Sequence, residues 1–161
     1  MSKEIQLTQG QVAIVDDEDY EYLNQWKWYA DYDARSKTYY AVRQTSRTLG
    51  KRNLIRMHRV IMNTPKGMEV DHIHHNGLDN RKSELRNVTT TQNSRNRRLH
   101  SDSTSGVTGV NYNKAKGGWV ARIGINGKPT EIKFSKSKDV AIAARKEAEK
   151  KYFGDFANQD N

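Results

Sequence analysis

Apolar and polar residues alternate in short runs along the first part of the chain. EIQLTQ and QVAIVD read as two strands, and KWYADYD and TYYAVRQT read as two more, with ARSK as the turn between them. Asp16 to Trp26 has an acidic first turn, which favours a helix N-terminus. NLIRMHRVIMNTPKG predicts a strand that runs into a brief helix ending before Pro65. Residues 1–66 are therefore expected to form a β-rich N-terminal region. The candidates for its small core are Trp26, Trp28, Tyr39, Tyr40, Ile55 and Ile61.

Residues 67–100 follow a different pattern of strand, polar loop, strand and helix. MEVDH and LRNVT read as the strands, and IHHNGLDNRKSE reads as the loop between them. Thr89 and Gln92 fit a capping box, so a helix through TTQNSRNRR should begin near Thr90 and carry Asn93 in its first turn. Asp71 and His72 end the first strand. We therefore expect Asp71, His72 and Asn93 to surround one point.

The rest of the chain predicts a short linker and a third region. LHSDSTSG is rich in Ser, Asp, Thr and Gly, which places a flexible linker at residues 101–106. Residues 107–158 then contain three strands, GVNYN, GGWVARIGI and TEIKFS, with a hairpin at Asn126-Gly127. A helix should start after Ser137 and stop at Gly154. The whole pattern predicts an α+β protein built from a β-rich region, a strand-strand-helix motif and a three-stranded antiparallel sheet backed by one helix.

Periodicity also predicts which faces meet in the third region. The helix has an apolar stripe at Val140, Ala144, Ala148 and Tyr152, which should cover one face of the sheet. Strand alternation then points seven residues toward the helix. These are Val110, Tyr112, Trp119, Ala121, Ile123, Ile132 and Phe134. The opposite face is expected to carry Asn111, Asn113, Val120, Arg122 and Lys133.

Composition narrows the class of protein. A hydrophobic fraction of 34% in 161 residues favours several small cores over one large core. The absence of cysteine excludes disulfides and thiolate zinc sites, and no segment resembles a transmembrane helix or a signal peptide. We expect a soluble protein of the cytoplasm, with no membrane partner.

The charge is distributed unevenly. Eight of the 19 acidic residues but only two of the 28 basic residues lie in the first 33 positions. The remaining chain is therefore strongly basic, and its mixture of Arg, Asn, Thr and aromatic residues favours a nucleic-acid partner. A basic surface that is only solvated is the alternative.

The chemistry of the central motif favours a metal-dependent reaction. A carboxylate from Asp71 and an amide oxygen from Asn93 are hard ligands that suit Mg²⁺ or Mn²⁺. His72 could then act as general base on a water that attacks phosphorus. A zinc site formed by His72, His74 and His75 is an alternative, which would need a fourth ligand.

VDHIHHNGLDNRKSELRNVTTTQNSRNR resembles the HNH endonuclease motif in the form found in phage and intron-encoded homing endonucleases. The resemblance implies a ββα-metal fold in which Asp71 and Asn93 bind the metal and His72 is the general base. Glu84 stands where the family has its central asparagine. Because a carboxylate cannot donate a hydrogen bond, that tether must be lost or taken over by a neighbour such as Asn80 or Asn87.

Residues 106–158 resemble the AP-two/ethylene-response-factor DNA-binding domain through GV.Y, W.ARI and the final YFG. The resemblance implies that the sheet contacts DNA. Arginines after the motif would follow the DNA as well. The implied DNA contacts are Arg95, Arg97, Arg98, Asn111, Asn113, Lys114, Arg122 and Lys133.

Together these patterns predict an endonuclease that nicks or cleaves double-stranded DNA. One ββα centre per chain cuts one strand, so a monomer should nick and a homodimer would be needed for a double cut. If the protein is phage-encoded, it acts in the bacterial host. One alternative is a DNA-binding protein whose nuclease centre is silent because of Glu84. Another is a basic RNA-binding or structural protein in which DHIHH is an incidental loop.

Overall fold

The computed structural model describes residues 1–45, 53–96, 99, 103–125 and 127–157. The chain divides into two compact units, Met1–Asn93 and Ser94–Asn161, which we call the N unit and the C unit. Strands predominate and helices are few, so the predicted α+β class is confirmed. Arg97, Arg98 and Asn126, together with residues 101–102 of the predicted linker, lie outside the described residues.

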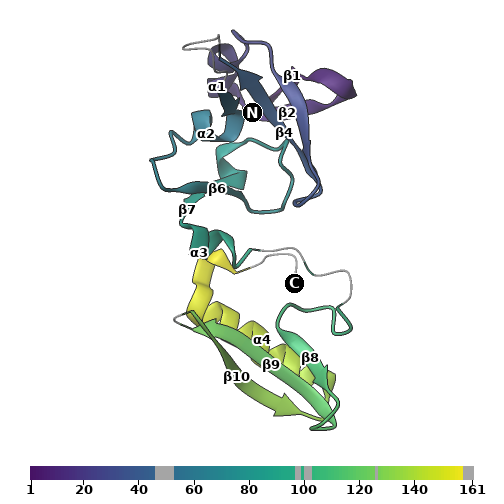
Figure 1. Cartoon of the computed structure of the whole chain (residues 1–161). Coiled ribbons are helices and arrows are strands. Elements are labelled where there is room, and N and C mark those ends of the chain that lie inside the picture. Colours follow the sequence, from purple (N-terminus) through teal and green to yellow (C-terminus); the bar gives the residue numbers. More distant parts are fainter. Residues whose placement is uncertain (46–52, 97–98, 100–102, 126, 158–161) are drawn as a thin grey trace. The chain divides into compact units, whose positions relative to one another are not determined.

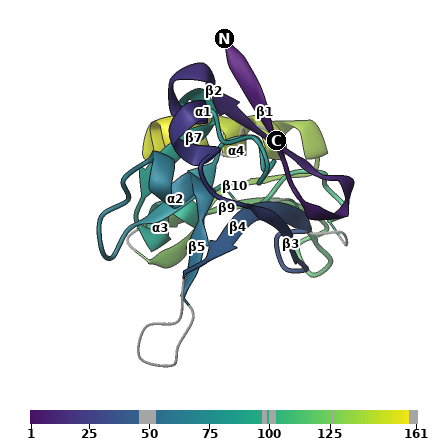
Figure 2. The same cartoon turned by 90° about the horizontal axis from the view of Figure 1, so that it is seen from above.

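The elements of the N-terminal region agree closely with the alternation of its sequence (Figure 1). They are β1 (Ser2–Gln6), β2 (Val12–Asp16), α1 (Asp17–Leu23), β3 (Tyr29–Asp33), β4 (Thr38–Gln44), β5 (Leu54–Arg56) and α2 (Met57–Ile61). β1 and β2 form an antiparallel pair, and β4 lies between β3 and β5 in a second antiparallel sheet, as Figure 2 shows. Asp17, Glu18 and Asp19 occupy the first turn of α1, where the helix dipole favours acidic side chains.

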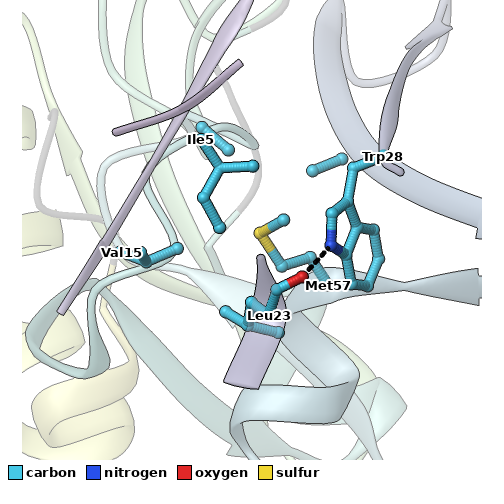
Figure 3. Close-up of a cluster of buried hydrophobic side chains, with 7 residues drawn as sticks. Ile5, Val15, Leu23, Trp28 and Met57 are labelled. Carbon is cyan, nitrogen blue, oxygen red and sulfur yellow. Dashed lines mark hydrogen bonds between the residues drawn. The ribbon is translucent and has the colours of Figure 1, made fainter. Parts of the chain in front are cut away.

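The core of the N unit forms where these elements bury alternate residues. Ile5, Val15, Leu23, Trp28 and Met57 are each no more than 3% exposed, and Figure 3 shows them packed together. The indole of Trp28 donates a hydrogen bond of 2.8 Å to the carbonyl of Leu23, so its polar atom is satisfied inside the core. Of the other predicted core residues, Trp26, Ile55 and Ile61 are partly buried against this cluster.

The central motif folds as two strands and a short helix, β6 (Glu69–His72), β7 (Leu85–Val88) and α3 (Thr90–Asn93). The predicted capping box is confirmed. Gln92 accepts a bond of 2.8 Å from the backbone of Thr89, and its own backbone donates to the Thr89 hydroxyl at 3.2 Å. However, α3 ends at Asn93, earlier than TTQNSRNRR predicted. Asn and Ser, which follow, compete for backbone hydrogen bonds and are weak helix formers.

The loop between β6 and β7 is attached to the N-terminal region by backbone bonds. The backbone of Ile14 donates to Leu78 at 2.9 Å and accepts from Asn80 at 2.7 Å, which makes a short parallel bridge between β2 and the loop. Asp16 accepts a bond of 2.8 Å from the backbone of Lys82. Residues 1–66 therefore share one compact unit with the central motif as far as Asn93.

The C unit has the sheet and helix that its sequence predicted. β8 (Val110–Asn113), β9 (Gly118–Ile125) and β10 (Lys128–Ser135) form an antiparallel sheet with β9 in the middle, and α4 (Lys138–Phe153) follows (Figure 1). Ser137 is the residue before α4, and Gly154 ends it with a positive φ of 54°. This backbone conformation suits glycine, which has no side chain to clash.

The predicted apolar stripe of α4 is correct at Ala148, which is buried in a cluster with Ile123 of the sheet, and wrong at its two ends. Val140 and Tyr152 are 45% and 44% exposed, and the other buried positions are Ala141, Arg145, Glu149 and Phe153. Arg145 pairs with Glu149 at 2.7 Å and also donates to the backbone carbonyl of Arg122. The inward face of the helix thus includes a buried ion pair. A stripe chosen from apolar residues alone cannot include Arg145 and Glu149. The predicted stripe is therefore rotated around the helix axis from the face that is buried.

A β-bulge changes the predicted faces of the sheet. The register between β9 and β10 shifts between Glu131 and Lys133, so Phe134 pairs with Val120 and Lys133 pairs with Ala121. Directly opposite residues share a face, and Ala121 belongs to the core beneath α4. Phe134 therefore lies on the face opposite α4, and Lys133 lies on the α4 side, the reverse of the prediction. We call the face opposite α4 the outer sheet face. It carries Asn111, Asn113, Gly118, Val120, Arg122, Glu131 and Phe134.

Candidate active site

The antiparallel pairing of β6 with β7 places Arg86 directly opposite Asp71. Arg86 donates from Nε to Asp71 Oδ2 at 2.8 Å, and its Nη2 lies 2.6 Å from the same oxygen. Asp71 is only 6% exposed. A buried carboxylate is costly unless it is paired, so the bonds from Arg86 offset the cost of burying Asp71 inside the N unit.

His72 is buried on the other face of β6, among rings from two other elements. Its ring centroid lies 5.0 Å from that of His58 on α2, edge to face, and 5.7 Å from that of Tyr40 on β4. Burial lowers the pKa of His72 below its ordinary value, although a hydrogen bond with Asn80 and the negative charge of Asp71 oppose this shift. The imidazole is therefore neutral at pH 7 and can accept a proton.

His58 is packed in the interior of the N unit. It is 6% exposed and lies edge to face against Tyr40, with ring centroids 5.5 Å apart. Burial lowers the pKa of His58 to about 2, and the positive charges of nearby arginines act in the same direction. A neutral ring therefore supports one side of His72.

Asn93 approaches β6 from the short helix α3. Its amide nitrogen donates to Glu69 Oε2 at 2.6 Å, and Thr90 donates to Glu69 Oε1 at 2.9 Å. Because an ionised carboxylate only accepts hydrogen bonds, the nitrogen of the Asn93 amide must face Glu69, which directs its carbonyl oxygen away. Glu69 and Asp71 are two residues apart on one strand, so their side chains lie on the same face. Asn93 is thus held at the Asp71 face of β6, whereas His72 lies on the other face of this strand, so the expectation that all three side chains surround one point stays a prediction.

The loop after His72 is held tightly, and Glu84 contributes to this. The backbone of Ile73 donates to the Glu84 carbonyl at 3.0 Å, and the Glu84 carboxylate bonds His74 Nδ1 at 2.6 Å. Asn80 is fully buried and bonds His72, while Asn87 donates to the carbonyl of Met62 at 3.1 Å. Glu84 and Asn80 therefore hold the loop, whereas Asn87 ties β7 to the end of α2.

The donor set suits a hard divalent cation better than zinc. Asp71 and Asn93 supply carboxylate and amide oxygens, which Mg²⁺ and Mn²⁺ prefer. In the part of the chain that the structure describes, no three His, Cys, Asp or Glu side chains gather as a metal cluster. Two of the three histidines of the alternative zinc site have different partners, since His74 bonds Glu84 and His72 packs against Tyr40 and His58.

The C-unit residues expected to contact DNA have different surroundings. Asn111, Lys114, Arg122 and Lys133 are exposed, and Asn113 is half-buried. The guanidinium of Arg95 lies 4.7 Å from the ring centroid of Phe153, a cation–π contact that packs it against α4.

Three residues of the site were not expected from the sequence. They are Arg86, Glu69 and Tyr40, which hold Asp71, Asn93 and His72 respectively. The sequence contained a clue to Arg86. If LRNVT pairs antiparallel with EVDH, one of the first residues of LRNVT must lie opposite Asp71. Tyr40 had none, because the contact depends on a sheet that is distant in sequence.

A comparison with known proteins identifies the family. The chain is 32% identical over 154 residues to an uncharacterized HNH endonuclease of Acanthamoeba polyphaga mimivirus, covering 92% of this chain and 74% of the relative. This chain therefore belongs to the HNH endonuclease family. No family model matches the sequence, and no solved structure matches it. None of the helices among the described residues has the length and apolar character needed to span a bilayer.

Proposed function

We propose that this protein is a metal-dependent endonuclease that nicks or cleaves duplex DNA by hydrolysing a phosphodiester bond. The observation that carries the proposal is the pair of adjacent residues at the end of β6. Asp71 is held by Arg86 on one face, and a neutral His72 is held by Asn80, Tyr40 and His58 on the other. The uncharacterized viral relative, which bears the name of an HNH endonuclease, supports the same class of reaction.

Each residue has a distinct role in this proposal. Asp71 and Asn93 bind Mg²⁺ or Mn²⁺ through oxygen atoms, and His72 removes a proton from the attacking water. The bound metal would shield the phosphate charge and stabilise the leaving 3′ oxygen. Arg86 keeps the Asp71 carboxylate oriented, and Glu69 keeps the Asn93 amide oriented.

We infer that the C unit recognises DNA, as its resemblance to the AP-two/ethylene-response-factor domain implies. The outer sheet face presents Asn111, Asn113 and Arg122, which can contact bases or phosphates. Lys114 and Lys133 would contact phosphates from the turn and the edge of the sheet. Arg95, Arg97 and Arg98 would contact the DNA backbone. A monomer would nick one strand, and a homodimer would be required for a double cut. If the chain is phage-encoded, its compartment is the bacterial cytoplasm.

Two observations favour a second candidate function. Arg86 already occupies an oxygen of the proposed metal ligand Asp71, and Glu84 replaces the family's central asparagine. Both features fit a DNA-binding protein whose nuclease centre is silent. Such a protein would bind duplex DNA without cutting it.

A supercoiled-plasmid assay separates these functions. We expect open circles to appear with Mg²⁺ or Mn²⁺ and not with EDTA. His72→Ala should lower the nicking rate by roughly 10²- to 10⁴-fold, the usual contribution of a general base. Its affinity for duplex DNA should stay near that of the unaltered protein.

The matched control is His74→Ala, since His74 is an exposed neighbour outside the proposed chemistry and should leave nicking largely intact. Circular dichroism of both variants checks that the fold survives. Intact plasmid with a clear gel shift would favour the silent protein. Equal loss of cutting and binding in His72→Ala would refute the role of His72.

A further inference from the structure

The outer sheet face contains a carboxylate at the centre of its positive charges. Lys116 Nζ lies 2.8 and 3.0 Å from the two carboxylate oxygens of Glu131, and Arg122 Nη2 lies 3.7 Å from Glu131 Oε2. We call Lys116, Arg122 and Glu131 the Glu131 cluster. Glu131 and Arg122 are directly paired across β10 and β9, so the contact is part of the sheet register.

The bulge in β10 helps to build this cluster. It brings Phe134 to the outer sheet face, where its ring lies over Gly118; a Cβ at Gly118 would come within 2.8 Å of the Phe134 ring. The Lys116 ammonium is 5.8 Å from the centroid of the same ring. Lys116 is therefore positioned between an aromatic ring and a carboxylate.

The Glu131 cluster contributes little to the fold. Its side chains are 34% to 48% exposed, and water and salt weaken ion pairs at such positions. The backbone of Arg122 is held independently of its side chain, since its nitrogen donates to Gly109 at 2.8 Å and its carbonyl accepts from Arg145. The Arg122 side chain can consequently change partners while the sheet stays intact.

The charges of the Glu131 cluster have opposite effects on DNA binding. Lys116 and Arg122 can neutralise phosphates, which increases affinity for any sequence. Glu131 repels phosphates and binds both cations in the free protein. Its carboxylate can instead accept a hydrogen bond from the amino group of cytosine, which a phosphate cannot donate.

We propose that Glu131 is a specificity-determining residue of the outer sheet face, which withholds Lys116 and Arg122 from phosphates and so suppresses binding to duplex DNA of arbitrary sequence. The proposal rests on the DNA-binding function inferred above for the C unit. It assigns selectivity to a negative charge on a face whose positive charges alone would bind any duplex.

Glu131→Gln tests this role, because it removes the charge and keeps the size of the side chain. The probe is a mixed-sequence duplex of about 30 base pairs, titrated by fluorescence anisotropy from roughly 50 to 200 mM salt. We expect the variant to bind about 3- to 10-fold more tightly at the low-salt end. The slope of log affinity against log salt should steepen by about 1 to 2, because each new phosphate contact adds about 0.9.

Glu147→Gln is the matched control, since Glu147 is exposed on α4 and the substitution makes the same change in net charge. It should leave the salt slope unchanged. Adding Lys116→Ala and Arg122→Ala to Glu131→Gln should abolish the gain. The proposal for Glu131 would be overturned if Glu131→Gln had the same salt slope as the unaltered protein, or if Glu147→Gln gained as much affinity. Either result would leave the DNA-binding function of the C unit standing. An unaltered protein that neither binds the duplex nor nicks plasmid would overturn the proposed function together with this inference.

Discussion

The two units of this protein hold their functional candidates in opposite ways. In the N unit, Asp71, His72 and Asn80 are almost fully buried, and each is bonded to other side chains of the interior. In the C unit, Asn111, Arg122 and Glu131 lie exposed on a sheet whose core is formed separately, beneath α4. The candidate active site is thus part of the core of the N unit. Substitutions there should affect stability and activity together, whereas the C-unit face should tolerate change without unfolding.

Gly77→Ala should have the largest effect on the N unit. The added Cβ would lie 2.4 Å from the carbonyl of Tyr39 and 2.7 Å from the ring of Tyr40, and neither a backbone atom nor a packed ring can move away easily. We expect a loss of about 3 kcal/mol in unfolding free energy, at the upper end of typical overpacking. The loop that carries His74 should shift, and nicking should fall. Urea unfolding followed by tryptophan fluorescence measures the first effect.

Gly124→Ala, in β9 of the C unit, is its control, because a Cβ there meets no atom within 4 Å. It should change the unfolding free energy little. If both substitutions lower the unfolding free energy equally, the close packing of Gly77 against β4 does not explain the loss in Gly77→Ala.

Acid should destabilise the N unit through His58. Burial lowers the pKa of His58 to about 2 in the folded protein, from an ordinary value of 6.5. Between these two values the unfolded chain binds a proton that the folded chain does not. The contribution of His58 to the unfolding free energy is therefore fully present above pH 6.5. It falls as the pH drops, and about 2 kcal/mol is lost at pH 5.

Unfolding free energies measured between pH 7 and pH 5 test this dependence. His58→Gln should flatten the curve, although His72, whose pKa is also lowered, keeps part of the slope. The described residues of the C unit contain no histidine, so its stability should vary less over this range. An unchanged slope in His58→Gln would remove His58 from the explanation.

Arg122→Ala should separate binding from folding in the C unit. The side chain is exposed and the backbone bonds of Arg122 remain in the variant, so the melting temperature should be nearly unchanged. Duplex affinity should fall by roughly 1–2 kcal/mol, about 5- to 30-fold in Kd, if Arg122 contacts a base edge. Anisotropy titrations and thermal melts give both values. Full affinity would show that the Arg122 side chain makes no contact with the duplex.

Glu84→Asn should have the smallest effect. The backbone carbonyl of residue 84 accepts a hydrogen bond from Ile73 whichever side chain is present. The ion pair between Glu84 and the exposed His74 contributes less than about 1 kcal/mol to stability. Restoring the family's asparagine should therefore change neither stability nor nicking appreciably, because the backbone carbonyl of residue 84 and the side chain of Asn80 still hold the loop. A large gain in the single-turnover nicking rate would show that these tethers are insufficient.

The sequence predicted the local elements better than their contacts. Alternation identified the strands of both units, and Thr89 with Gln92 correctly marked the start of α3. Both depend on interactions within a few residues, which the chain pattern contains directly. The roles of Asp71, His72 and Asn93 came from resemblance to the HNH motif and stay predictions until cleavage is measured.

Errors arose where a distant partner decides the outcome. The apolar stripe of α4 was misplaced because Arg145 is buried by its bonds to Glu149 and to the carbonyl of Arg122. Phe134 was assigned to the wrong face because alternation assumes a regular register and cannot detect a bulge. In both cases a pairing between elements overrode the local pattern.

The sequence by itself determined the α+β class, the order of the elements and the basic character of the chain after residue 33, since these follow from local periodicity and composition. Only the tertiary structure decided that Arg86 bonds Asp71, that Tyr40 and His58 enclose His72, and that Glu131 lies between Lys116 and Arg122. Such contacts join residues from different elements. Their geometry depends on strand register and packing, which no single segment of the chain encodes.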